Sequence, residues 1–242
     1  MAAEFLDWLA IPPGRRWLDI GCGTGILTQA ILARFDPRSV VGVDPSDGFL
    51  ERARSNVWDE RTTFVAGSAD ATGLDDGAAD VAVAGLVLNF VPDVDAALAE
   101  ARRVLHPGGV IAGYVWDYAK GMEMMRRFWD VAIALDPAAR ALDEGPRFPV
   151  TAEGGLARAF ASAGFEEVRT RPIDVPTVFT GFDDLWTPFL GGTGPAPAYV
   201  MSLTVSARDA LRERLRASVT PEPDGSIRLV ARAWAASGLR PA

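Results

Sequence analysis

The sequence has few of the residues that metal binding and nucleophilic catalysis require. Its 242 residues include one cysteine, Cys22, and one histidine, His106. A single cysteine excludes an intrachain disulfide and a thiolate-rich metal site. His106 lies in a turn that leads into a predicted strand, and no nucleophile–histidine–acid arrangement can be built around it. We therefore predict no metal site, a turn role for His106 and a packing role for Cys22.

Long apolar runs and clusters of positive charge are also missing. The longest apolar run, residues 81–91, is interrupted by Asn89 and is far shorter than the roughly 20 residues of a membrane span. Residues 1–13 have neither a basic start nor a signal-like core. The formal net charge of −8 argues against a broad nucleic-acid surface. We therefore expect a cytoplasmic protein, a monomer or homodimer, with no membrane or nucleic-acid partner.

Length and composition indicate one globular domain. Hydrophobic residues make up 49% of the chain and charged residues 23%, both ordinary values for a folded domain. A chain of 242 residues can bury one large core and carry an insertion, but has little room for a second core. We predict a single domain over residues 1–242.

The most informative stretch is WLDIGCGTG at residues 17–25. Residues 16–20 are typical of a short buried strand, and residues 24–35 of a helix. The three glycines between positions 21 and 25 therefore fill a strand-to-helix turn, where the backbone bends tightly and a ligand can approach closely.

A carboxylate follows at the end of the next predicted strand. Residues 40–43 form that strand and Asp44 closes it. A carboxylate at this point can accept hydrogen bonds from both hydroxyls of a ribose. Together with the glycine turn, Asp44 indicates a nucleoside site. The alternative is that the glycines only punctuate a loop and that Asp19 only caps a turn.

Charge and spacing indicate which nucleoside is bound. A dinucleotide fingerprint would place its third glycine where this chain has Ile26. A pyrophosphate would also disfavour the carboxylate of Asp19 beside the turn. S-adenosylmethionine (SAM) fits better, because its ammonium and sulfonium are positive and its carboxylate can meet the N–H groups at the start of the helix.

Residues 14–117 resemble the class I SAM-dependent methyltransferases. The resemblance implies an α/β fold, a Rossmann-like seven-stranded mixed sheet with helices on both faces. Later segments look like those of a bacterial subgroup of that family. The matching motifs are the turn at 19–25, Asp44, GSAD at 67–70, the segment at 80–93 and RVLHPGG at 103–109. The cofactor-binding residues that the resemblance implies are Asp19, Gly21, Cys22, Gly23, Gly25, Asp44, Pro45, Ser68, Ala69, Asp70, Gly85 and Leu86.

Two positions depart from the family pattern. The adenine-contacting acid that usually follows the glycine is replaced by Ser68, so Asp70 or the Ala69 backbone can contribute instead; Asp70 can equally be a solvated loop acid. Asn89 and Phe90 are expected near the methyl acceptor, by resemblance. Many relatives have histidine where this chain has Asn89, and asparagine cannot remove a proton.

The second half of the chain carries the candidate acceptor residues. We predict that residues 118–150 and 180–205, the cap segments, form a lid over the acceptor site, with backbone freedom from Gly191, Gly192 and Gly194. The alternative is a dimer interface or plain core. The candidates to orient or deprotonate the acceptor are Asp117, Tyr118 and Asp130. Trp116, Trp129 and Trp186 are the candidates for an aromatic wall. Arg147 is the candidate to bind an acidic group of the acceptor.

Hydrophobic periodicity predicts the remaining elements. Helix 24–35 is expected to turn Ile26 inward, and the next helix to turn Phe49 inward. The further predicted helices are 46–57, 94–105, 122–135, 152–163 and 207–219. The further predicted strands are 62–66, 81–88, 110–115, 168–179 and 227–235, of which 168–179 is interrupted by two prolines. Residues 136–150 are predicted to form a loop.

The predicted function is transfer of a methyl group from SAM to a small-molecule acceptor, which gives S-adenosylhomocysteine. A SAM- or nucleoside-binding regulatory or scaffold protein without transfer activity is the alternative. A nicotinamide oxidoreductase is disfavoured by the spacing of Asp19 and Gly25. The identity of the acceptor, and whether the methyl goes to O, N or C, is not written in the sequence.

Overall fold

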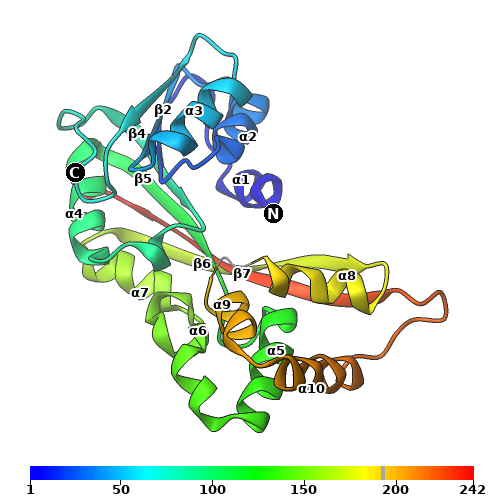
Figure 1. The fold of residues 1–242 in the computed structure, drawn as a ribbon. Coiled ribbons are helices and arrows are strands. Elements are labelled where there is room, and N and C mark those ends of the chain that lie inside the picture. Colours follow the sequence, from blue (N-terminus) through cyan, green and yellow to red (C-terminus); the bar gives the residue numbers. More distant parts are fainter. Residues whose placement is uncertain (192–193) are drawn as a thin grey trace. The chain divides into compact units, whose positions relative to one another are not determined.

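A seven-stranded sheet organises the chain (Figure 1). The computed structural model describes residues 1–191 and 194–242; Gly192, one of the glycines predicted to give a cap segment freedom, lies outside them. The strands follow the order β3-β2-β1-β4-β5-β7-β6 across the sheet. Their bounds are β1 Arg16–Ile20, β2 Ser39–Asp44, β3 Thr62–Ala66, β4 Ala79–Gly85, β5 Leu105–Trp116, β6 Glu166–Phe179 and β7 Ile227–Leu239.

The sheet is mixed. Strands β3, β2, β1, β4 and β5 pair in parallel. Strand β7 runs antiparallel to β5, since Arg240 N–H donates to Gly109 O at 2.8 Å and Asp117 N–H donates to Arg232 O at 2.9 Å. Because the parallel strands share a direction, the carboxyl ends of β1, β2 and β4 meet at one edge. The predicted α/β fold class is confirmed.

Helices cover both faces of the parallel part of the sheet. Figure 1 shows α1, α2 and α3 on one side of β4 and β5, and α4 and α7 on the other. The α-helices are α1 Ala2–Leu9, α2 Ile26–Phe35, α3 Asp47–Asn56, α4 Val94–Val104, α5 Glu123–Leu135, α6 Glu144–Arg147, α7 Gly155–Ser162, α8 Phe182–Trp186, α9 Pro195–Ser202 and α10 Val205–Ala217. None of the helices in the described residues is long and apolar enough to cross a membrane.

The chain divides into two compact units. Unit 1 comprises residues 1–115, 153–173 and 234–242, and unit 2 comprises residues 116–152 and 174–233. Strands β6 and β7 contribute residues to both units. A single domain, and a role of the cap segments as a lid, stay predictions.

The core of unit 1 follows the expected alternation of strand and helix. Trp17 and Leu18 of β1 are buried with the central strands. Helix α1 buries Phe5, Leu6 and Leu9. The ring of Phe5 lies 4.7 Å from that of Tyr114 on β5. Burial of such side chains stabilises the unit by about 1.5–3 kcal/mol each.

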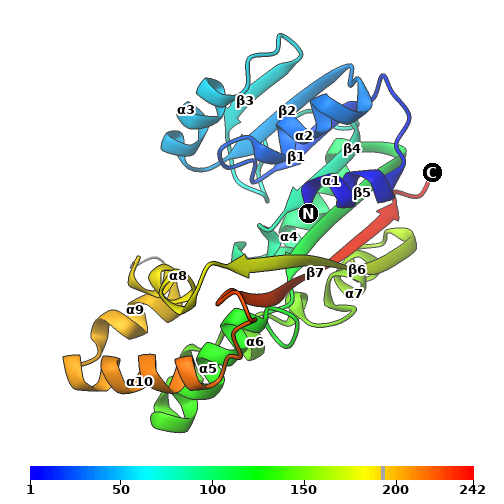
Figure 2. The ribbon, with the colours of Figure 1, turned by 90° about the vertical axis from the view of Figure 1, so that its right-hand side faces the viewer.

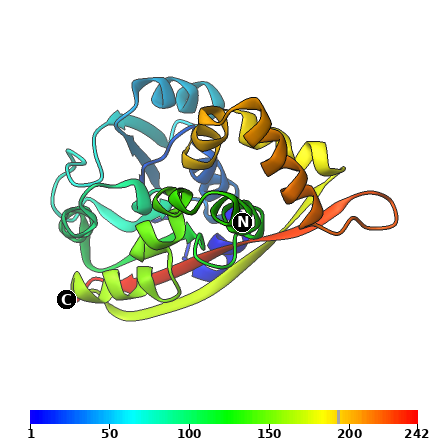
Figure 3. The ribbon, with the colours of Figure 1, turned by 60° about the horizontal axis from the view of Figure 1, so that its bottom comes forward.

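Unit 2 has a hydrophobic core of its own. Phe128 and Trp129 of α5 are fully buried, and Phe128 stacks on Phe189 with ring centroids 4.4 Å apart. Helix α10 packs on α5 (Figures 1 and 2). A turn at residues 222–226, closed by Glu222 N–H donating to Ser226 O at 2.7 Å, joins α10 to β7 (Figure 3).

Four predictions about elements and their buried faces are wrong. The loop expected at 136–150 contains short helices, because Asp136 and Asp143 each accept a backbone N–H at a helix start. Strand β6 is continuous through Pro172 and Pro176, because β6 is an edge strand that tolerates missing donors. Ile26 is 68% exposed on a helix whose buried face consists of Leu27, Thr28 and Ile31. Phe49 is likewise 52% exposed.

Candidate cofactor and acceptor site

A cavity of about 510 Å³ lies within unit 1, at the carboxyl ends of the parallel strands. Ten residues predicted to contact cofactor or acceptor line it: Gly21, Gly23, Asp44, Pro45, Ser68, Ala69, Asp70, Gly85, Leu86 and Phe90. Sequence reasoning assigned no site role to the other lining residues, Val43, Ser46, Phe49, Val87, Val91 and Pro92. Phe49 has no predicted site role because an apolar residue of a helix is expected to face the core, whereas Phe49 is exposed.

The glycine turn forms one wall of this cavity. Gly21 has φ +64°, and a Cβ there would lie 2.3 Å from Val87 Cγ2. Gly23 has φ +53°, and a Cβ there would meet no atom within 4 Å. Gly21 is therefore required by both conformation and space, whereas Gly23 leaves the turn open to the cavity.

Asp44 holds the turn against the end of β2. Its Oδ2 accepts from Gly23 N–H at 3.0 Å and its Oδ1 accepts from Ser46 N–H at 2.9 Å. Ser46 in turn caps α3 by accepting from Phe49 N–H. A carboxylate has about four acceptor positions, so Asp44 can still accept two hydroxyl groups. Its carboxylate is 6% exposed and lines the cavity.

Asp19 is a buried acid behind the turn. Its Oδ2 accepts from Thr28 Oγ1 at 2.7 Å, whereas its buried Oδ1 has no hydrogen-bond partner in the described residues. Burial raises the pKa of Asp19 to about 7. An unpartnered buried acceptor oxygen is costly, and a positive charge nearby would favour the ionised form.

Cys22 and Gly25 support the turn from beneath. Cys22 is buried in a cluster with Leu50, Ala53 and Phe64, and burial raises the pKa of its thiol. A Cβ at Gly25 would lie 2.8 Å from a Val57 methyl group. Neither residue lines the cavity, so the structure gives both a packing role; contact with a cofactor stays a prediction for them.

The segment after β3 forms the opposite wall. Ser68 and Ala71 exchange backbone hydrogen bonds of 3.2 Å in both directions. This tight bend presents Ser68, Ala69 and Asp70 to the cavity together. Which of them contacts an adenine stays a prediction.

The end of β4 carries backbone strain and a buried amide. Leu86 has φ +60°, which is uncommon for a residue with a Cβ and costs about 1–3 kcal/mol. Its N–H donates to Tyr114 O at 2.8 Å. Asn89 is 5% exposed, and neither its Oδ1 nor its Nδ2 has a partner in the part of the chain that the structure describes. Phe90 is 63% exposed.

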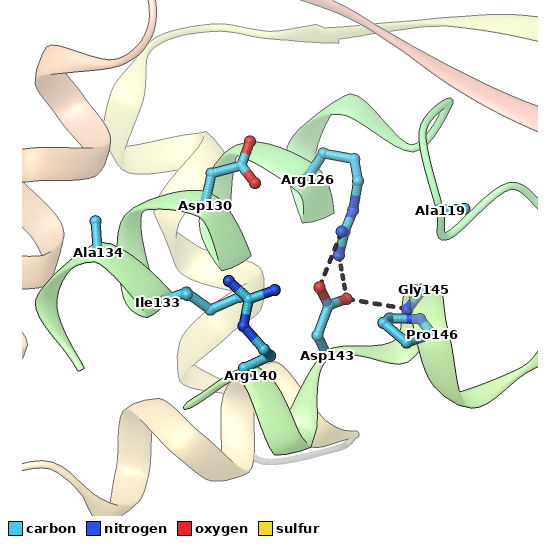
Figure 4. Close-up of a pocket in the computed structure, with 9 residues that line it drawn as sticks. All are labelled: Ala119, Arg126, Asp130, Ile133, Ala134, Arg140, Asp143, Gly145 and Pro146. Atoms are coloured by element: carbon cyan, nitrogen blue, oxygen red, sulfur yellow. Dashed lines mark hydrogen bonds and ion pairs between the residues drawn. The ribbon is translucent and has the colours of Figure 1, made fainter. Parts of the chain in front are cut away.

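Of the candidate acceptor residues of unit 2, Asp130 lines a cavity whose lining does not include the others. Asp117 is buried and accepts from Lys120 N–H at 2.9 Å, which gives it the role of a turn residue. Tyr118 packs against Phe148, and burial raises its pKa to about 12, so its hydroxyl stays protonated at neutral pH; its role at an acceptor stays a prediction. Asp130 lines a second cavity, within unit 2 (Figure 4).

The predicted aromatic wall is mainly core. Trp129 and Trp186 are 0% and 5% exposed and belong to the hydrophobic core of unit 2. Trp116 is half-buried at the end of β5. Arg147 is exposed and its guanidinium carbon lies 5.6 Å from the centre of the Phe148 ring. Their contact with an acceptor stays a prediction.

Comparisons with known proteins agree with this geometry. Residues 18–113 match the methyltransferase domain family. The chain is 38% identical over 111 residues to trans-aconitate 2-methyltransferase from Methylobacterium radiotolerans, covering 46% of this chain and 42% of that protein. It is 36% identical over 99 residues to malonyl-[acyl-carrier protein] O-methyltransferase from Serratia marcescens, covering 41% and 37%. The matches span less than half the length of both curated relatives.

A solved structure shares the fold. It is phosphoethanolamine N-methyltransferase 2 from Haemonchus contortus, in complex with phosphomonomethylethanolamine and S-adenosylhomocysteine. The TM-score is 0.62 at 16% identity, over 100% of this chain and 52% of that one. Residues 18–113 are therefore similar in sequence to the methyltransferase domain family, and the chain shares the fold of a solved methyltransferase.

Proposed function

We propose that the unit 1 cavity binds SAM and that the chain transfers its methyl group to a small-molecule acceptor, with S-adenosylhomocysteine as the second product. One observation carries the proposal. A glycine turn, the cavity-lining carboxylate of Asp44 and the buried acid Asp19, whose Oδ1 has no partner among the described residues, lie together at the carboxyl ends of β1 and β2.

The residues of this cavity fit each part of SAM. Asp44 has acceptor positions free for the ribose hydroxyls. Asp19 supplies a negative charge close to the turn, suited to the ammonium and sulfonium. The start of α2 offers N–H groups to the methionine carboxylate. The Ser68–Asp70 bend and Phe49 provide polar and apolar surface for the adenine.

The reaction requires alignment more than acid–base chemistry. SAM supplies an electrophilic methyl group on a sulfonium, which is a good leaving group. The chain must hold the acceptor in line with that methyl and exclude water, and proximity can contribute roughly 7–11 kcal/mol in favourable cases. The buried amide of Asn89 can donate to or accept from an acceptor group, and Phe90 offers apolar surface at the cavity.

The acceptor is proposed to be a small molecule, and carboxylates are the first class to test. Two relatives are named for trans-aconitate and for malonyl attached to a carrier protein, both of which carry carboxylates. The net charge of −8 supports the absence of a nucleic-acid substrate. We further propose that the cap segments select the acceptor, and that the protein acts in the cytoplasm as a monomer or homodimer.

Calorimetric titration with SAM, S-adenosylhomocysteine and NAD tests the cofactor assignment. We expect SAM and its product to bind and NAD to bind much more weakly. Asp44→Ala should weaken SAM binding by about 1–3 kcal/mol, as for a lost charged hydrogen bond. Asp47→Ala, which removes an exposed acid three residues further on, should leave SAM affinity unchanged. Tight NAD binding without SAM binding would overturn the assignment.

Transfer itself is tested with SAM labelled on the methyl carbon and a panel of small carboxylates, alcohols and amines. We expect label in at least one acceptor and release of S-adenosylhomocysteine. Asn89→Ala should lower kcat for that acceptor while SAM affinity stays within a few-fold. Tight SAM binding with no transfer to a broad metabolite panel would favour the regulatory alternative.

A further inference from the structure

A second cavity, of about 580 Å³, lies entirely within unit 2. Figure 4 shows that charged side chains of both signs reach it from α5 and from the short helices that follow. Its lining consists of Arg126, Asp130, Arg140 and Asp143, with Ala119, Ile133, Ala134, Gly145 and Pro146. Cavities of this size take small organic molecules.

Two of the four charges are already satisfied by each other. Arg126 Nη1 donates to Asp143 Oδ2 at 3.0 Å, and Arg126 Nη2 donates to Asp143 Oδ1. Asp143 also accepts from Gly145 N–H at 2.9 Å and so begins α6. The two side chains are 17% and 7% exposed. This ion pair is therefore a fixed, neutral part of the wall.

The other two charges are free. Asp130 on α5 and Arg140 in the 3₁₀ helix Pro137–Leu142 are both exposed. Neither side chain has a hydrogen bond or ion pair with another residue in the described ranges 1–191 and 194–242. Figure 4 shows both charged groups at this cavity. The cavity therefore presents one unpaired positive and one unpaired negative group.

This pair of opposite charges selects a ligand that carries both signs. A simple anion would meet Arg140 but would leave Asp130 unpaired, and a simple cation would do the reverse. Beside the charges, Ile133, Ala134 and Pro146 offer apolar surface. We propose that the unit 2 cavity binds a small zwitterion of the amino-acid type. Its carboxylate lies on Arg140, its ammonium on Asp130 and a short apolar group on the apolar residues.

This site uses no residue of the unit 1 cavity, so amino-acid binding and SAM binding can be measured independently. The test is a ligand-observed NMR screen of the full chain with the twenty protein amino acids, followed by calorimetry. The strongest binder is then compared with its deaminated acid and its decarboxylated amine. We expect both analogues to bind at least tenfold more weakly. No binding by any amino acid, or equal binding by either analogue, would overturn the proposal.

Charge-removing variants locate the binding. Arg140→Gln and Asp130→Asn should each weaken binding of the best amino acid at least tenfold. Arg214→Gln and Asp209→Asn are matched controls on α10, because both positions are exposed and outside the cavity lining. The controls should bind as the wild type does, and SAM affinity should be unchanged in all four variants. Equal weakening by the controls, or wild-type binding by both cavity variants, would contradict the assignment.

Discussion

The two cavities are built in different ways. The unit 1 cavity is made by backbone: a glycine turn, a strained residue at Leu86 and the tight bend after β3. Of its two buried acids, Asp44 lines the cavity and Asp19 lies behind the glycine turn. The unit 2 cavity is lined by the charged side chains of two arginines and two aspartates, together with small and apolar residues. A site formed mainly by backbone is therefore recognisable from a short stretch of sequence. A site formed by side chains is encoded by charged residues that are separated from one another in the sequence.

The largest expected effect is on the stability of unit 2. Asp143→Ala would strand the buried guanidinium of Arg126 and remove the cap of α6. Removal of one partner of a buried ion pair costs about 3–5 kcal/mol, which denaturant unfolding would measure. Arg212→Gln breaks an exposed ion pair with Asp183 and should cost less than about 1 kcal/mol. If both variants lose the same small amount of unfolding free energy, the Arg126–Asp143 pair does not stabilise the wall of the unit 2 cavity.

A second expected effect separates space from conformation in the glycine turn. Gly21→Ala and Gly14→Ala both place a Cβ at positive φ, but only Gly21 would meet a neighbour, Val87. Gly21→Ala should therefore cost about 1–3 kcal/mol more than Gly14→Ala, the usual range for overpacking. Chemical denaturation of both variants gives the difference. Equal free energies of unfolding for the two variants would show that the Val87 side chain can move aside, and the glycine turn would then be less rigid than described.

A third effect is the pH dependence of SAM affinity. The pKa of Asp19 is raised to about 7 by burial, with a smaller contribution from the charge of Asp44. Asp19 is therefore protonated below pH 7 and loses its attraction for a positive ligand there. SAM affinity should fall by up to about tenfold per pH unit below 7. Asp19→Asn should flatten that dependence. If the SAM affinity of the wild-type protein does not change between pH 5.5 and 8, the prediction is contradicted.

The same carboxyl affects stability in the opposite direction. Its folded pKa lies above the ordinary value of 3.8, so the folded chain retains a proton that the unfolded chain has lost. The free energy of unfolding should therefore decrease through this group as pH rises from about 4 to about 7. Asp19→Asn should remove that contribution, which denaturation at pH 5 and pH 7 would detect.

The smallest effect concerns the exposed aromatic residues. Phe49 lines the cavity and is 52% exposed, whereas Trp58 is 89% exposed and does not line it. Phe49→Ala should weaken SAM binding by about 1 kcal/mol, the value of a modest apolar contact. Trp58→Ala should leave affinity unchanged. A reversed order would place the adenine away from α3.

Much of the fold could be predicted, because its signals are local. Strands β1, β2 and β3 lie where the sequence placed them, since short apolar runs bounded by turn residues allow few alternatives. Periodicity could not place Ile26 and Phe49. Both residues match an inward-facing helical pattern, yet both are exposed, and of the two only Phe49 lines the unit 1 cavity.

Local spacing predicted which backbone-built parts of the unit 1 cavity lie together, and the roles of the site residues stay predictions. The glycine turn and Asp44 come together around one cavity, as their spacing indicated. Trp129 and Trp186 are buried in the core of unit 2, because aromatic residues at helical spacing supply core before they supply a binding wall. The sequence gives no indication that Arg140 lines a cavity, because the role of a single arginine depends on residues that are near it in space.

The central claim is that the unit 1 cavity holds SAM through Asp44. A crystal structure of the chain with S-adenosylhomocysteine tests it most directly. We predict ligand density in this cavity, with the ribose hydroxyls within hydrogen-bond distance of the Asp44 carboxylate and the adenine against Ser68–Asp70. Ligand density elsewhere in the molecule, or a ribose turned away from Asp44, would contradict the claim.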